Sequence, residues 1–277
     1  MKKNKEQPPP SRIPSTEELR KFAGQTIRLL NKCIAQFEPA KQLKDQIMLC
    51  LLTKEFKTYR NVFKIADQGD SDTPPILARV IYELALSIVY LLLNEDENPN
   101  LYDEFKKTAL QRAYQSIGEM EHSKYSDRNS TKKTILSIKQ KLSDEGFQVE
   151  ESSENFPKSW HSNLSYYQMA EAVGEEFLTF YTGFYGTTSI FVHPSWLDLE
   201  QNHIITTQKG TKSRIISPTL SVYPLCTVTC LLLISSEICA MKLSEKNRTK
   251  NVRLVNKIRR VHHLFHNGSP EPPFYDY

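Results

Sequence analysis

The chain has 277 residues, of which 39% are hydrophobic, so it can bury the core of one large domain or of two small ones. Nine glycines are too few for a loop-rich all-β protein, and a net charge of +4 gives no global case for nucleic-acid binding. Five cysteines without a Cys-x-x-Cys pair do not match the ligand spacing of a structural zinc site and indicate reduced thiols. We therefore expect an all-α, cytoplasmic protein that holds neither a metal ion nor another cofactor.

The N-terminal part of the sequence predicts a polar tail followed by two helices. Residues 1–15 carry charges and prolines but no apolar signal segment, so we expect a disordered tail there. Helical periodicity begins near Thr16, where Glu17 and Glu18 favour the start of a helix. A second helix is expected over 39–66, because proline is a good first-turn residue.

The stretch 76–93 is apolar, aromatic or hydroxyl-bearing at every position except Arg79 and Glu83. A helix that is apolar all round is a buried helix, and burying two ions costs several kcal/mol each unless they are paired and hydrogen-bonded. We therefore expect this charge pair inside the protein. Three interpretations stay open: an ordinary ion pair on a partly exposed face, a buried structural network, and a ligand-binding or catalytic site. The apolar surroundings favour the buried network.

The middle of the chain changes in texture. A helix is predicted over 101–120, after which serine, lysine, glutamate, asparagine and aspartate dominate. We expect a flexible polar insertion at about 121–159, with a short helix over 131–142. A long helix is then predicted over 166–192.

Four polar side chains recur every fourth residue near the end of that helix. They are Tyr181, Tyr185, Ser189 and His193, and the spacing places them on one helix face. Histidine is the side chain best suited to proton exchange near neutral pH, and a tyrosine beside it can hold an anionic group. The alternative, which we favour slightly, is a core histidine with satisfied ring nitrogens. Ser189 alone is no nucleophile, because this helix offers neither a strained elbow nor an orienting acid.

The C-terminal third predicts mixed elements. β-Branched residues around a Lys-Gly pair predict a small β-hairpin over 204–216. Helices are expected over 219–242 and 246–265, followed by an extended tail over 267–277. The apolar part of the first of these helices is too short to cross a bilayer, so we expect no membrane span.

The last predicted helix carries a basic stripe with spacings of four, three, four and three residues. Its members are Lys246, Lys250, Arg253, Lys257 and Arg260. A cationic helix face of this kind can bind the phosphates of a nucleic acid. The ordinary alternative is a solvated helix face, which we favour.

Several of these residues also form a pattern along the chain. The pattern consists of Leu77-x-Arg79-x-x-x-Glu83, the Tyr102 segment, Trp160, and Tyr185-x-x-x-Ser189-x-x-x-His193-Pro-Ser195. In order and spacing it resembles a bacterial, all-helical family of unknown function over about 45–243. The resemblance implies that the helix of Arg79 and the helix of His193 contribute to one site. It also implies a genomic neighbourhood of phage-defence or mobile-element genes.

Together these observations predict a single helical domain over 16–266, built as a bundle of seven to nine helices around one polar site. Our hypothesis is an effector or accessory component of a defence or toxin-like system that cleaves RNA without a metal ion. The expected catalytic set is Arg79, Glu83, Ser189 and His193, and the expected ligand-binding set is Trp160, Tyr181 and Tyr185. Arg79 would bind phosphate, Glu83 would orient it, and His193 would act as general acid and base.

Two other hypotheses remain beside this one. The protein can be a non-enzymatic binding module that contacts a partner protein or a nucleic acid, with a purely structural polar network. It can also recognise a small anionic ligand. In each case the expected partners are RNA or another phosphate-bearing ligand, a partner protein of a defence system, and a second copy of the chain in a homodimer.

Overall fold

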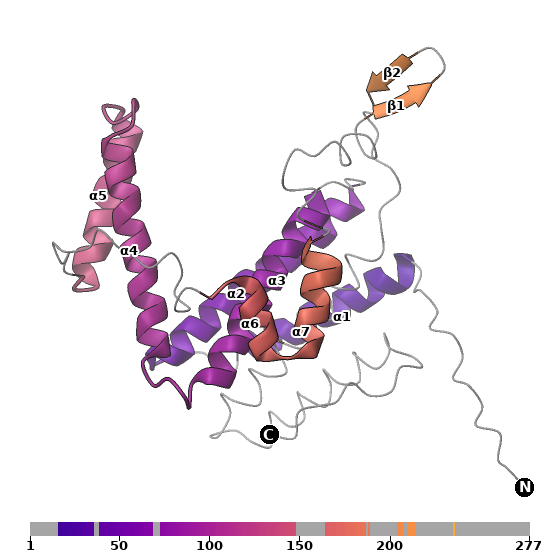
Figure 1. The fold of residues 1–277 in the computed structure, drawn as a ribbon, viewed down its shortest axis with the longest axis horizontal. Helices are drawn as coiled ribbons and strands as arrows, with labels where there is room; N and C mark the ends of the chain where they lie inside the picture. Colours follow the sequence, from indigo (N-terminus) through magenta and orange to yellow (C-terminus); the bar gives the residue numbers. More distant parts are fainter. Residues whose placement is uncertain are drawn as a thin grey trace, which may run out of the picture. The chain divides into compact units, whose positions relative to one another are not determined.

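The computed structural model describes residues 16–35, 39–68, 73–147, 164–186, 188, 204–207, 210–213 and 235 (Figure 1). Seven α-helices lie within this part of the chain: α1 (Thr16–Ile34), α2 (Leu43–Asp67), α3 (Thr73–Asn94), α4 (Leu101–Glu121), α5 (Asn129–Asp144), α6 (Tyr166–Val173) and α7 (Glu175–Phe180). A π-helical turn, η1 (Tyr181–Tyr185), continues from α7. The predicted all-α class is confirmed.

The small β-hairpin lies where the sequence predicts it. Strands β1 (Ile204–Thr207) and β2 (Gly210–Ser213) pair antiparallel, with Ile204 opposite Ser213 and Thr207 opposite Gly210. The predictions for the N-terminal tail, the helices beyond the hairpin and the C-terminal tail fall outside the described residues.

By its contacts the chain divides into two compact units. The first unit comprises residues 1–93 and 170–277, and the second comprises 94–169. The second unit therefore takes in the whole of α4 as well as the predicted 121–159 insertion. Compact units of this kind can belong to one domain or to two, so the single domain over 16–266 stays a prediction.

The core of the first unit is built by α1, α2, α3 and η1. Its buried members are Ala23, Leu30, Phe56, Tyr59, Val62, Ala78, Ile81 and Phe184. Each large apolar side chain that is fully buried contributes about 1.5–3 kcal/mol to folding. Elements that lie far apart in the sequence are thus held together by one hydrophobic cluster.

Helix α3 is the most deeply enclosed element of the first unit. Thirteen of its 22 residues are buried, as expected for a helix with apolar side chains on nearly every face. Among the described helices α3 also has the length and composition to cross a membrane, and 61% of that apolar stretch is buried inside the fold. The core helix of a soluble protein passes the same test, so this is weak evidence for a span.

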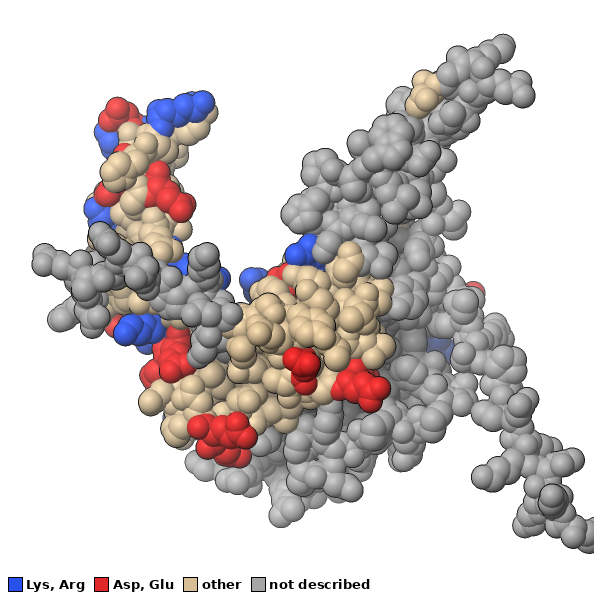
Figure 2. Space-filling model, in the orientation of Figure 1, with Lys and Arg blue, Asp and Glu red and all other residues tan. Residues whose placement is uncertain are grey.

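The second unit is centred on α4 and α5, which share a small apolar cluster. It contains the buried residues Ile117, Ile135 and Leu142. Helix α5 ends in a Schellman motif, in which the amide of Phe147 donates to the carbonyl of Leu142 at 2.9 Å and Gly146 has a φ of 65°. Positive and negative side chains are interspersed over the visible face of α4 and α5 (Figure 2). Three ion pairs form within this unit: Lys139–Glu121, Lys106–Glu145 and Lys132–Asp127.

Candidate functional site

Arg79 and Glu83 lie one turn apart on α3 and form an ion pair. The guanidinium Nε of Arg79 donates to Oε1 of Glu83 at 3.3 Å. Their side chains are 20% and 29% exposed. The prediction that the pair lies inside the protein is therefore wrong, because both residues border a strip of α3 that reaches the surface. Ile76, Val80 and Glu83 lie along this strip at helical spacing. The strip cannot be recognised from composition, because α3 has apolar side chains on nearly every face.

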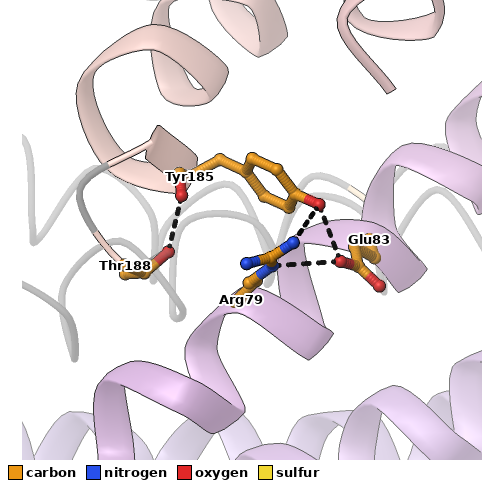
Figure 3. A network of polar contacts seen from close by, with 4 residues as sticks. All are labelled: Arg79, Glu83, Tyr185 and Thr188. Carbon is orange, nitrogen blue, oxygen red and sulfur yellow. Dashed lines mark hydrogen bonds and ion pairs between the residues drawn. The ribbon is translucent and has the colours of Figure 1, made fainter. Parts of the chain in front are cut away.

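Tyr185 joins this ion pair from a distant part of the chain. Its phenol oxygen accepts a 2.8 Å hydrogen bond from Nη2 of Arg79 and donates a 3.0 Å bond to Oε1 of Glu83 (Figure 3). The guanidinium carbon also lies 4.3 Å from the centre of the Tyr185 ring. Charge-assisted hydrogen bonds and a cation–π contact are among the stronger polar interactions in proteins. Three side chains from α3 and η1 thus form one polar network.

The protonation states within the network follow from burial and neighbours. Burial and the adjacent carboxylate of Glu83 raise the pKa of Tyr185 to about 12, so its phenol keeps its proton. Burial opposes the charge on Arg79, but its bonds to Tyr185 and Glu83 outweigh burial and raise its pKa. The site therefore presents a fixed positive guanidinium at neutral pH, beside a phenol that donates to Glu83.

The helix that carries Tyr185 is not the continuous α-helix that the sequence predicts over 166–192. Gly174, with a φ of 135°, separates α6 from α7, and the chain then widens into the π-helical turn η1. Only glycine adopts this conformation readily, so Gly174 was the available signal for the break. Inside η1 the rings of Tyr181 and Tyr185 stack at 4.9 Å. Single π-helical turns occur frequently at functional sites.

Tyr82 and Thr188 support Tyr185, and neither was among the predicted site residues. The phenol of Tyr82, on α3, donates to the carbonyl oxygen of Phe177 at 2.9 Å, and its ring packs 5.4 Å from that of Tyr185. The hydroxyl of Thr188 donates to the carbonyl oxygen of Tyr185 at 3.0 Å (Figure 3). Tyr82 precedes Glu83 directly, so a tyrosine inside an apolar helix was a visible signal.

A second buried polar contact was also missed. Glu55, on α2, is fully buried, and its Oε1 accepts a 3.2 Å hydrogen bond from Ser235. Its other oxygen, Oε2, has no hydrogen-bond partner. Burial raises the pKa of Glu55 well above its ordinary value, which favours the protonated carboxyl group.

The remaining predicted site residues divide as follows. Arg79, Glu83, Tyr181 and Tyr185 come together around α3 and η1. Trp160, Ser189, His193 and the five cations of the C-terminal basic stripe lie outside the described residues. In the described part of the chain, no three His, Cys, Asp or Glu side chains are grouped to hold a metal ion.

Residues 45–211 match a family described as a family of unknown function, DUF5677. That range is more than half of the chain and contains both halves of the polar network. The chain belongs to this family. The prediction of a family of unknown function is thus confirmed, over a shorter range than the 45–243 inferred from the motifs, while the family's motifs, bacterial origin and gene neighbourhood stay predictions. No curated protein and no solved structure matches the chain.

The range that matches DUF5677 contains some of the predicted functional elements and leaves out others. It includes α2 from Asp45 onward, all of α3, and the predicted polar helix face from Tyr185 to His193. It leaves out most of the N-terminal region and the basic stripe of residues 246–260. Any role of that stripe therefore rests on this sequence alone.

Proposed function

We propose that the protein is an effector or accessory component of a bacterial defence or toxin-like system, and that its polar network binds and cleaves RNA. The observation that carries this proposal is the position of Arg79. Its guanidinium is charged, partly exposed and held from two sides by Tyr185 and Glu83. Arginine held in this way is well suited to bind a phosphoryl group, because it can donate parallel hydrogen bonds without having to be ordered first.

The carboxylate of Glu83 supports a ligand-facing role. Both described hydrogen bonds to this side chain end on Oε1, and no described residue bonds Oε2. Since the side chain is 29% exposed, Oε2 is available to accept a hydrogen bond from a ribose hydroxyl. The stacked rings of Tyr181 and Tyr185 add an aromatic element, and Trp160 is proposed to stack on a base.

The proposed chemistry uses the polar side chains that follow Tyr185 at intervals of four residues. Ser189 and His193 follow it by four and eight residues, and His193 takes the proton of a ribose 2′-hydroxyl. The 2′-oxygen then attacks the adjacent phosphorus, the bond to the 5′-oxygen breaks, and protonated His193 gives its proton to that leaving oxygen. Arg79 stabilises the charge on the phosphoryl oxygens, and Ser189 holds one of them. The basic stripe of residues 246–260 guides the strand.

The test is incubation of the purified protein with total RNA, with His193→Ala as the control variant. Cleavage by the wild type and its loss in His193→Ala and Arg79→Ala, both of which still fold by circular dichroism, is the expected result. If the purified wild type leaves total RNA intact, the proposed cleavage is wrong.

A second candidate is a non-enzymatic binding module, and a specific observation favours it. Arg79, Glu83 and Tyr185 bond one another, and the ion pair carries no net charge, which is how a network that only sets helix register is built. In that case Arg79→Ala and Tyr185→Phe lower the stability, and RNA stays intact with every variant.

A further inference from the structure

Helix α2 has an exposed face that carries only positive charge. Its four members are Lys54, Lys57, Arg60 and Lys64, which we call the α2 stripe, and all four are exposed. Spacings of three, three and four residues keep them within roughly one third of the helix circumference. The opposite face of α2, with Leu52, Phe56, Tyr59 and Val62, is buried in the core of the first unit.

No exposed acidic side chain lies between Lys54 and Lys64 on α2. Glu55 is the one acid between Asp45 and Asp67, and it is fully buried. Among the described residues, none of the four cations takes part in an ion pair, whereas three lysines of the second unit do. An ordinary solvated helix surface carries interspersed charges of both signs. Glu55 lies on the apolar face of α2, three residues after Leu52 and four before Tyr59, so the exposed face from Lys54 to Lys64 carries only positive charge.

The dimensions of the α2 stripe suit a row of phosphates. Ten residues of α-helix span ~15 Å, the length of about four phosphates of a strand that rises ~3.4 Å per nucleotide. Helix α1, which packs against α2, exposes three more cations, Lys21, Arg28 and Lys32. When cations without ionic partners bind the phosphates of a polyanion, the counterions that are condensed on the polyanion are released, and this release drives the binding.

We propose that the α2 stripe binds the sugar–phosphate backbone of RNA and is the surface that delivers the strand to the protein. The inference rests on the proposed function in naming RNA as the partner, but it concerns binding and not cleavage. It adds a nucleic-acid surface on α2 to the candidate stripe of residues 246–260.

An anionic membrane is the competing partner for a basic helix. A helix that lies in a membrane interface inserts its apolar face among the lipids. The apolar face of α2 is already occupied by the core of the first unit, through residues such as Phe56 and Tyr59. Only the charged face remains for a partner, and this favours a hydrophilic polyanion.

The experiment measures binding of the full-length protein to a fluorescent 2′-O-methyl RNA of about 20 nucleotides, at salt concentrations from about 50 to 200 mM. The 2′-O-methyl groups remove the nucleophile, so binding is read without cleavage. The test variant replaces all four residues of the α2 stripe by glutamine. The matched control replaces three lysines and one arginine of the second unit, all exposed, and changes the net charge equally: Lys107, Arg128, Lys133 and Lys141.

We expect the test variant to bind about tenfold or more weakly at ~100 mM salt, while the control variant binds like the wild type. The slope of log Kd against log salt should fall by about two to three, since each phosphate contact on a single strand contributes ~0.7. Circular dichroism should give the same melting curve for both variants, because every changed side chain is exposed.

Equal RNA binding by wild type and test variant overturns the inference. So does binding of wild-type protein to vesicles of phosphatidylserine and phosphatidylcholine with no binding to the RNA. Stripe-dependent binding by a protein that cleaves no RNA supports the inference while it overturns the proposed cleavage, so the two failures are distinguishable.

Discussion

Arg79 Nη2 donates a 2.8 Å hydrogen bond to the phenol oxygen of Tyr185, although 106 residues separate the two in the chain. The same phenol donates to Glu83, so one oxygen atom connects η1 to both charged residues of α3. Together with the packing of Phe184 in the core of the first unit, this oxygen holds η1 against α3 at the candidate site.

Replacing Tyr185 by phenylalanine removes that oxygen and keeps the ring. We expect the free energy of unfolding to fall by about 1–2 kcal/mol, because two hydrogen bonds to charged groups are lost at a partly buried site. Urea denaturation measures the change. Tyr125→Phe is the matched control, since the Tyr125 ring is 43% exposed and its loss of a hydroxyl should cost little. Equal stability of the two variants would show that the network contributes nothing to folding.

Replacing Arg79 by lysine keeps the positive charge but removes the planar guanidinium. We expect RNA cleavage to fall by roughly 10- to 100-fold, because lysine cannot hold Tyr185, Glu83 and a phosphate together. The melting temperature should fall by only a few degrees, since the side chain is partly exposed. Cleavage assays and thermal melts on the same preparation check both statements. Arg128→Lys serves as the control, and undiminished cleavage by Arg79→Lys would remove Arg79 from the site.

Replacing Glu55 by glutamine should change how stability depends on pH. Because the pKa of Glu55 is higher in the folded than in the unfolded state, unfolding releases a proton, and stability falls as pH rises. The stabilising effect is complete below the unfolded pKa and is lost as pH rises towards the folded one. Glutamine carries no titrating proton, so its advantage over the wild type should grow from pH ~5 to ~7, by at most about 1.4 kcal/mol per pH unit.

Urea denaturation at a series of pH values measures this difference. The exposed Glu119, replaced by glutamine, is the control and should show no such trend. A constant difference between wild type and Glu55→Gln across the series contradicts a protonated, buried Glu55.

Two glycines of the second unit should respond to alanine in opposite directions. Gly146 has a φ of 65°, and alanine there should lower the free energy of unfolding by about 1 kcal/mol. Gly118 lies inside α4 with nothing within 4 Å of an added Cβ, and alanine there should raise it by about 0.5–1 kcal/mol. Denaturation of the two variants side by side tests the pair. The same sign for both would contradict the conformation at Gly146.

The elements of this fold follow mainly from local sequence, and so they were predictable. The apolar run of α3, the acidic start of α1 and the Lys-Gly pair at the start of β2 act over a few residues each. The contact between Arg79 and Glu83 belongs to this class as well, because side chains four residues apart on a helix are neighbours in any fold.

The partners of those elements could not be predicted in the same way. The exposed edge of α3 depends on which neighbours cover it, and the break at Gly174 depends on a glycine conformation that composition does not reveal. The closure of the network by Tyr185 required a helix that is more than one hundred residues away. The four-residue spacing of the polar side chains indicated the helix face on which Tyr185 lies, but it did not indicate the contact of Tyr185 with Arg79 and Glu83.

By itself the sequence determined an all-α chain, a largely buried third helix and an ion pair on it, because each depends on periodicity along one segment. Only the tertiary structure decided that Tyr185 completes the pair, that the pair reaches the surface, and that Glu55 is withdrawn from α2's charged face. The physical reason is the same in all three cases. Exposure and long-range hydrogen bonds are set by what packs against a side chain, and packing partners are chosen by the whole fold.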